Sequence, residues 1–286
     1  MKIAYFPNQI ALNAKPVLDA FLQGCAWLDI ETVPNSMDAD AAVIWSVLWH
    51  GRMRENESIY RLYRQQNKPV FVLEVGMLRR GSTWKLGLNG TWAGCYPGKI
   101  KLNRAEELGL SLEPWRDDGI NIVVACQRSD SEQWASQPPS EVWLNDTVRS
   151  IRQHSERPII IRPHPRQRIT NIPGAVIEQP KSLVNTYDGF DYDRVLNQAW
   201  AVVNHNSGPG AQAIIAGVPA FVGSTSLALP VANTDLAQIE NPQRPDRQQW
   251  LNELAHSEWT VKELATGNPL NRLLHAVPSF TLVDPS

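Results

Sequence analysis

Short apolar runs alternate with amphipathic stretches along the whole chain. Ala41–Leu48 and Ile120–Cys126 are almost continuously apolar, which is typical of strands buried on both faces of a parallel sheet. Pro16–Leu28 and Glu55–Gln66 carry the spacing of amphipathic helices. This alternation predicts an α/β fold. The other predicted strands are Lys2–Phe6, Pro69–Val75, Arg157–Ile161, Ala175–Glu178, Trp200–Val203 and Pro219–Val222, and the other predicted helices are Ser140–His154, Tyr192–Gln198, Gly208–Ala216 and one around Arg247–His256.

A charged connection at Leu112–Asp118 interrupts this pattern and separates two α/β series. We therefore expect two Rossmann-like domains, residues 1–115 and residues 116–286, with a helical tail on the second. Ligands of open parallel sheets bind beyond the carboxyl ends of the strands, so a cleft faced by both domains is the expected place of function.

The composition fits a soluble protein with a full hydrophobic core, since 43% of the residues are hydrophobic and 20% are charged. The net charge is only −2, so any electrostatic steering must come from local clusters. No apolar run approaches the roughly 18 residues of a membrane-spanning helix. The apolar stretch after Lys2 stops at Pro7, too short for a signal peptide, and Cys25, Cys95 and Cys126 form no pair motif. We expect a cytoplasmic protein with no membrane insertion, and no pattern specifies an oligomer.

Polar residues follow three predicted strands of the second series, where a ligand of a parallel sheet would bind. They come after Ile120–Cys126, after Arg157–Ile161 and after Trp200–Val203. Each set alone also fits a structural role, as a solvated loop, a rigid strand exit or a helix cap. The residues that we expect to bind a ligand are Gln127, Arg128, Asp130, Arg162, His164, His205, Asn206, Ser207 and Gly208.

The third of these loops has the chemistry of a phosphate site. A small, glycine-rich turn that leads into a helix exposes backbone N–H groups at the positive end of the helix dipole. Ser207 can cap that helix and donate to a phosphate oxygen, and the guanidinium of Arg162 can bind phosphate in fork geometry. The three loops together favour a phosphate-bearing ligand.

These loops resemble a known family. Arg162–Pro165 (RPHP), Trp200–Gly210 (WAVVNHNSGPG) and Ala211–Val222 (AQAIIAGVPAFV) are similar to the nucleotide-sugar domain of two-domain GT-B glycosyltransferases. The resemblance is to the capsule polysaccharide and Kdo-transferase-like branch, several small members of which are encoded by bacteriophages. The tail from Pro245 is also similar, so the resemblance covers about residues 120–267.

The resemblance implies transfer from a UDP- or CMP-linked sugar, by an inverting or a retaining route. Arg162 and His164 would be catalytic, because they would stabilise the charge that develops on the leaving phosphate. It also implies a reaction without a metal or other cofactor. Asp38-Ala-Asp40 has the Asp-x-Asp form of a metal-binding motif, but it precedes a predicted strand instead of following one. Gln212 stands where relatives commonly have a donor-binding Glu, which leaves the identity of the donor open.

An inverting transferase also needs a base for the acceptor hydroxyl. Glu74, near the end of Pro69–Val75, is the first candidate, and a buried pair with Arg79 or Arg80 is the structural alternative. His50 is the second candidate.

The acceptor is expected to bind at Val75–Ala105, which contains six cations and no acid, interleaved with aromatic residues. Cations and stacking platforms suit a nucleic acid, so the acceptor is either a 5-hydroxymethylated pyrimidine in double-stranded phage DNA or a capsule-type glycan. A non-catalytic nucleotide-binding or nucleic-acid-binding module and a nucleotide-sugar epimerase are the other hypotheses. The expected acceptor-binding residues are Arg79, Arg80, Trp84, Lys85 and Trp92.

Overall fold

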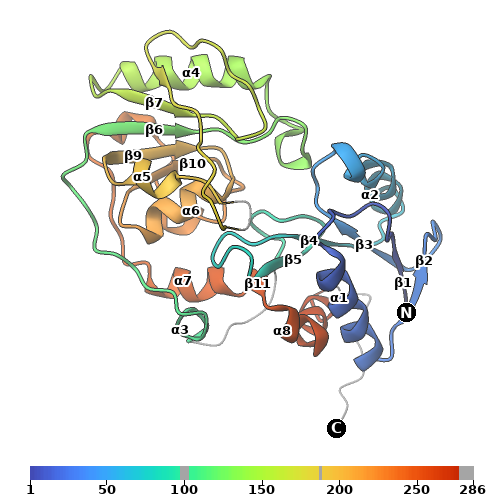
Figure 1. Cartoon of the computed structure of the whole chain (residues 1–286). Coiled ribbons are helices and arrows are strands. Elements are labelled where there is room, and N and C mark those ends of the chain that lie inside the picture. Colours follow the sequence, from blue (N-terminus) through green and yellow to red (C-terminus); the bar gives the residue numbers. More distant parts are fainter. Residues whose placement is uncertain (97–102, 187–188, 277–286) are drawn as a thin grey trace. The chain divides into compact units, whose positions relative to one another are not determined.

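The computed structural model describes residues 1–96, 103–186 and 189–276 (Figure 1). By its internal contacts the chain divides into two compact units. Each unit has its own sheet with helices on both faces, so the prediction of an α/β fold with two Rossmann-like parts is confirmed. Unit 1 comprises Met1–Lys101, Asp130–Glu132 and Ala255–Ser286, and unit 2 comprises Leu102–Ser129 and Gln133–Leu254.

The sheet of unit 1 has the strand order β11-β5-β4-β3-β1-β2. The strands from β4 to β2 are parallel, and β5 and β11 join antiparallel at one edge. In such a doubly wound order the direction of winding reverses between β1 and β3, where polar loops can diverge to bind a ligand. The strands are β1 (Lys2–Tyr5), β2 (Glu31–Pro34), β3 (Ala41–Trp45), β4 (Val70–Val75), β5 (Trp84–Leu88) and β11 (Glu258–Trp259).

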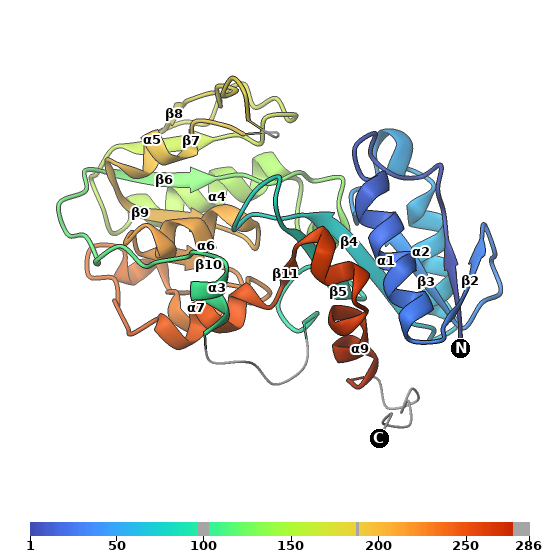
Figure 2. The same ribbon diagram turned by 60° about the horizontal axis from the view of Figure 1, so that its bottom comes forward.

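Helices cover both faces of this sheet because alternate strand residues are apolar on each side. Phe21 of α1 (Lys15–Trp27) packs on one face together with Leu264 of α8 (Val261–Ala265) and Leu273 of α9 (Asn268–Leu274). Tyr63 of α2 (Asn56–Gln65) packs on the other face. The two helices therefore lie on opposite faces of the parallel strands, and Figure 2 shows both of them.

The C-terminal segment belongs to unit 1, which differs from the predicted division at residues 115 and 116 and from the assignment of the tail to the second domain. The carboxylate of Glu258, which is 0% exposed, accepts hydrogen bonds from the N–H of Met77 (2.6 Å) and the hydroxyl of Thr83 (2.7 Å). A buried carboxylate needs such donors, so β11 is fixed to the edge of this sheet and α8 and α9 follow it.

The sheet of unit 2 is entirely parallel, with the order β10-β9-β6-β7-β8. This is the strand order of a dinucleotide-binding Rossmann fold, and its switch point lies between β6 and β9. The strands are β6 (Asn121–Ala125), β7 (Ile159–Arg162), β8 (Val176–Ile177), β9 (Ala199–Asn204) and β10 (Ala220–Val222).

The helices of unit 2 also divide between the two faces. Leu144 and Ile151 of α4 (Ser140–Arg152) pack on one face. Leu196 of α5 (Tyr192–Leu196) and Ala213 of α6 (Gly208–Ile215) pack on the other. The remaining helices of the described chain are α3 (Arg104–Glu107), α7 (Gln248–Ala255) and the short 3-10 helices Gly51–Met53, Glu132–Trp134, Leu229–Val231 and Leu236–Gln238.

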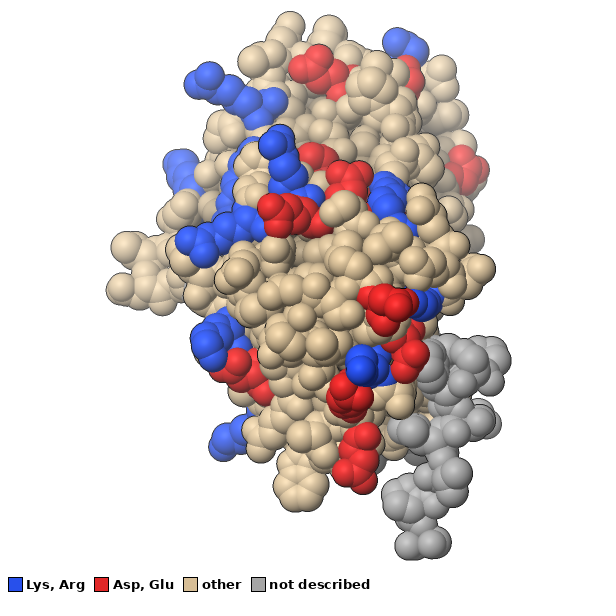
Figure 3. All heavy atoms as spheres, turned by 90° about the vertical axis from the view of Figure 1, so that its right-hand side faces the viewer, with Lys and Arg blue, Asp and Glu red and all other residues tan. Residues whose placement is uncertain are grey.

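Charged side chains of opposite sign lie beside one another on the face that Figure 3 shows, without a broad area of one sign. Within the described residues, no helix has the length and hydrophobicity to span a membrane.

Candidate functional site

The three predicted loops of unit 2 leave the same edge of one sheet. They follow β9, β6 and β7, which are parallel neighbours in that order. Neighbouring strands lie about 4.8 Å apart, so the loops begin within roughly 10 Å of one another. The loops after β6 and β9 flank the switch point, the usual ligand position in this fold.

Gln127 and Asn206 join the two loops at the switch point. The Gln127 Oε1 atom accepts a hydrogen bond from the N–H of Asn206 (3.1 Å), and the Asn206 amide donates to the hydroxyl of Thr225 (2.7 Å). Gln127 Nε2 and Asn206 Oδ1 are buried and have no hydrogen-bond partner within the described residues. Buried polar atoms without partners cost free energy, so a cluster of them at a switch point is typical of a binding site.

Ser207 is the N-cap residue of α6, as predicted, but its side chain does not cap the helix. Its hydroxyl oxygen instead accepts from Asn204 Nδ2 (2.7 Å). This contact leaves the Ser207 O–H hydrogen available for a ligand at the helix start, where backbone N–H groups already favour an anion. Asn204 was not among the predicted site residues, although its position two residues before Asn206 gives it a place in the same loop.

Gly210 allows the first turn of α6 to approach β9. A Cβ atom at this position would lie 2.5 Å from Asn204 Oδ1, a buried atom without a hydrogen-bond partner in the described chain. The turn therefore depends on the absence of a side chain at Gly210.

The two histidines of the predicted site have different surroundings. His164 Nδ1 accepts a hydrogen bond from the N–H of Arg166 (3.1 Å), which in the neutral ring leaves the hydrogen on Nε2. His205 packs edge-on against Trp134, with ring centroids 5.3 Å apart. Burial lowers the pKa of His205, so its ring is neutral near pH 7 and serves packing in this structure.

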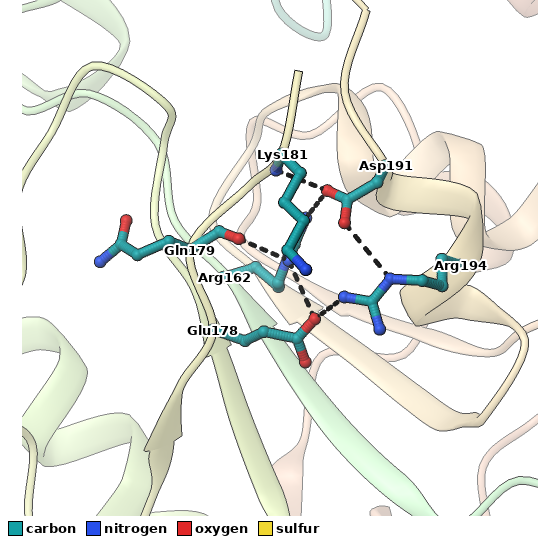
Figure 4. Close-up of polar contacts among 6 residues, drawn as sticks. All are labelled: Arg162, Glu178, Gln179, Lys181, Asp191 and Arg194. Atoms are coloured by element: carbon teal, nitrogen blue, oxygen red, sulfur yellow. Dashed lines mark hydrogen bonds and ion pairs between the residues drawn. The ribbon is translucent and has the colours of Figure 1, made fainter. Parts of the chain in front are cut away.

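Arg162 has carboxylate partners at both terminal nitrogens, whereas its Nε is buried and has no hydrogen-bond partner within the described residues, and its binding to phosphate stays a prediction. Its Nη2 atom donates to Asp191 Oδ1 (2.6 Å), and its Nη1 atom lies 3.3 Å from Glu178 Oε1. Arg194 also contacts both carboxylates, so two arginines and two acids form one cluster at the end of β7 (Figure 4). Arg162 is only 4% exposed, and a buried guanidinium requires such partners.

Asp191 is the centre of this cluster. Burial alone would raise its pKa, but the N–H of Lys181 (2.8 Å) and the guanidinium of Arg162 hold the pKa at about 2. Asp191 and Glu178 were not predicted, because they lie 29 and 16 residues from Arg162 in sequence.

The other predicted donor-binding residues occupy varied positions. Arg128 follows Gln127 and is buried, Gly208 begins α6, and Gln212 is half-buried within that helix. Asp130 packs within unit 1 instead, where its carbonyl oxygen accepts from the N–H of Trp49 (2.9 Å).

Glu74 of unit 1 contacts the hydroxyl of Ser46, which donates to Glu74 Oε2. Ser46 is 2% exposed and has a φ of 66°, a left-handed conformation that is uncommon for serine. Strained residues of this kind concentrate at functional sites. Lys85 lies directly opposite Glu74 in the β4–β5 register. His50, the second candidate base, is exposed, and its Nδ1 lies 3.5 Å from Asp130 Oδ2.

Only some of the residues that were expected to bind the acceptor are exposed. Arg79 and Arg80 are exposed, but Lys85 is 8% exposed and therefore cannot contact a polyanion. Trp84 and Trp92 pack against the two cores of unit 1. Of the other cations in that stretch, Arg104 is buried in unit 2, and Lys99 and Lys101 lie outside the described residues.

No group of three or more His, Cys, Asp or Glu side chains with the geometry of a metal site occurs within residues 1–96, 103–186 and 189–276.

No protein-family model matches the chain, and a comparison with curated proteins finds no match. Among solved structures, the chain is similar to Thermosulfurimonas dismutans KpsC, a β-Kdo 2,7-transferase, with 16% identity and a TM-score of 0.49 over 95% of this chain and 100% of that one. It is also similar to the KpsC β-Kdo 2,4-transferase, with 11% identity and a TM-score of 0.45 over 93% and 98% of the two chains. A weaker likeness is to Anabaena Alr3699/HepE in complex with UDP-glucose, with 10% identity and a TM-score of 0.34 over 96% and 95%.

Proposed function

We propose that the chain is a nucleotide-sugar-dependent glycosyltransferase whose donor binds to unit 2. The observation that carries this proposal is a group of buried polar atoms beside the start of α6, which have no hydrogen-bond partner in the described part of the chain and lie at the switch point of a Rossmann sheet. The resemblance of the loops around Arg162–Pro165 and Trp200–Gly210 to nucleotide-sugar domains supports the same conclusion.

The donor phosphate would bind at the first turn of α6. Backbone N–H groups there, the hydroxyl of Ser207 and the amide of Gln127 are donors held in fixed positions by their neighbours. Such preorganised donors stabilise the negative charge that develops on the phosphate as the bond to the sugar breaks. His164 would add a donor through Nε2, since its Nδ1 already accepts a hydrogen bond.

Glu74 would act as the base that removes the proton from the acceptor hydroxyl in an inverting reaction. Its partial burial and its contact with Ser46 hold the carboxylate at the end of β4. A carboxylate fixed in this way can accept a proton without reorganisation of the site.

The acceptor that fits best is the hydroxyl of a saccharide. Lys85 is buried, and Trp84 and Trp92 pack against the cores of unit 1, so these three residues offer little to the phosphates and bases of a hydroxymethylated DNA acceptor. The test below includes hydroxymethylated DNA, so it would also detect a DNA acceptor.

A screen of UDP- and CMP-sugars tests the proposal, with mass spectrometry used to detect nucleotide release in the presence of either oligosaccharides or hydroxymethylated DNA. We expect release with one donor, and Gly210→Ala should reduce donor affinity at least about tenfold by displacing Asn204. Binding without turnover would favour a non-catalytic module, and turnover without any acceptor would favour an epimerase or hydrolase. Absence of nucleotide binding would refute the proposal.

A further inference from the structure

The Arg162 cluster fixes the beginning of α5. Arg162 comes from the end of β7, and the Asp191 that it contacts is the residue immediately before α5. The N–H of Lys181 donates to the same Asp191 oxygen, and Arg194 Nε lies 3.3 Å from the other one (Figure 4). The carboxylate of Asp191 therefore has partners on both oxygens, and its position relative to β7 is determined.

Tyr192 carries this constraint from α5 to α6. It is the first residue of α5, adjacent to Asp191, and its hydroxyl donates to the carbonyl oxygen of Pro209 (3.2 Å). Pro209 lies in the first turn of α6. Burial raises the pKa of the Tyr192 hydroxyl, so the group remains protonated and keeps its role as a donor.

The first turn of α6 needs external support of this kind. It has the sequence Gly208-Pro209-Gly210, and glycine has the largest conformational freedom of any residue. Ser207 does not cap the helix with its side chain. A carbonyl oxygen has two lone pairs, so Pro209 can accept from Tyr192 and still accept within the helix.

We infer that Arg162 is a positioning residue, which acts through Asp191 and Tyr192 to hold the first turn of α6 in the orientation that binds the donor phosphate. This inference rests on the proposed function, because the α6 start is the proposed phosphate site. The constraint runs from Arg162 through Asp191 and the adjacent Tyr192 to Pro209.

The test compares Tyr192→Phe with Tyr60→Phe. Both substitutions remove a single hydroxyl that donates to a backbone carbonyl, that of Pro209 in one case and that of Asn89 (2.9 Å) in unit 1 in the other. Two measurements are made on the full chain: hydrogen exchange of the peptide containing residues 204–216, and the Kd for UDP and for CMP by calorimetry. For Tyr192→Phe we expect faster exchange and roughly fivefold weaker binding of the nucleotide that the wild type binds, because a net hydrogen bond is worth about 1 kcal/mol. Tyr60→Phe should change neither.

Arg162→Lys provides the second arm. Lysine keeps the charge but cannot contact Asp191 and Glu178 in the same fork geometry, so exchange of the same peptide should also rise. The effects of Arg162→Lys and Tyr192→Phe on Kd should be less than additive, because both act on one chain of contacts. A direct phosphate contact by Arg162 would instead weaken binding without faster exchange, which would overturn the inference. Unchanged exchange in Tyr192→Phe would overturn it as well.

If the wild type binds neither nucleotide, the proposed function fails separately, while the exchange data still decide whether Tyr192 holds α6.

Discussion

Asp191 shows how one buried carboxylate can join several elements of unit 2. Its partners come from β7, from the loop before α5 and from α5 itself. A buried carboxylate is stable only when donors surround it, so each of these elements is fixed by the same requirement. The strength of the arrangement is visible in the pKa of Asp191, which is held at about 2 although burial opposes this.

The low pKa of Asp191 predicts a specific loss of stability in acid. The group ionises at about 2 when folded and near 3.8 when unfolded, so its contribution is complete above the unfolded value and is lost as the pH falls through the folded value. A shift of this size is worth roughly 2 kcal/mol. Asp191→Asn should therefore lower the free energy of unfolding by about this amount near neutral pH, and the difference should vanish at about pH 2.

Urea titrations across this pH range provide the measurement. Asp146→Asn is the control, because Asp146 pairs with Arg149 on the surface at 3.0 Å with both side chains more than half exposed. Exposed pairs contribute about 1 kcal/mol or less, so this variant should change little. Equal losses in the two variants, or a loss in Asp191→Asn that does not depend on pH, would contradict the account of the cluster.

At the scale of elements, the contact between α1 and α8 joins the two ends of the sequence in unit 1. Gly24 lies in α1, and a Cβ atom there would meet the carbonyl oxygen of Leu264 far inside van der Waals contact. Gly267, with a φ of 77°, follows α8 and also approaches Gly24. Glycine at position 24 therefore sets how closely the C-terminal helices pack on the sheet.

Gly24→Ala is expected to destabilise the protein, although the same change inside an exposed helix stabilises by about 1 kcal/mol. The added methyl group would push α8 away from α1 and loosen the core around Leu264 and Phe21. Overpacking of this kind costs roughly 1–3 kcal/mol. Thermal unfolding would show the sign of the effect, and a rise in Tm would contradict the described packing.

The sequence pattern predicts the parallel strands except β2, and it misses the antiparallel edge of unit 1. Strands such as β6 are continuous apolar runs because both of their faces are buried. β5 (Trp84–Leu88) contains Lys85 and Gly87, and β11 has only two residues, so neither has a recognisable period. Their pairing depends on Glu258, whose partners lie more than 170 residues away in sequence.

The candidate site was predictable to a similar extent. The positions of Gln127 and Ser207 follow from the rule that ligands bind beyond strand ends. The carboxylate partners of Arg162 could not be predicted from the sequence, since Asp191 is brought to β7 only by the tertiary fold.

For the whole molecule, the distribution of charge argues against a nucleic-acid surface. The net charge is −2, and cations on the described surface lie beside acids, as in the pairs Lys2–Glu31 (2.9 Å) and Arg61–Glu132 (2.7 Å). Binding to DNA draws most of its free energy from cations that replace counterions along the phosphate backbone. Local pairing with acids reduces that contribution.

We therefore expect weak binding to a hydroxymethylated DNA duplex at physiological salt, with a Kd no tighter than the ~10⁻⁴–10⁻⁶ M of non-specific complexes. Fluorescence anisotropy over a range of salt concentrations would measure it. The double substitution Arg79→Glu and Arg80→Glu is the matched variant, since both side chains are exposed. Tight binding that is lost in this variant would favour DNA as the acceptor.

Asp130–Glu132 belongs to unit 1 although residues of unit 2 precede and follow it. Neither unit is therefore encoded by one uninterrupted piece of the gene. A recombination event with a single breakpoint between Arg61 and Asp130 would separate Asp130 from Trp49 and Glu132 from Arg61, and so would break hydrogen bonds within unit 1. Chimaeras that exchange whole halves with a related protein should consequently fold poorly, whereas substitutions within the loops would leave both units intact.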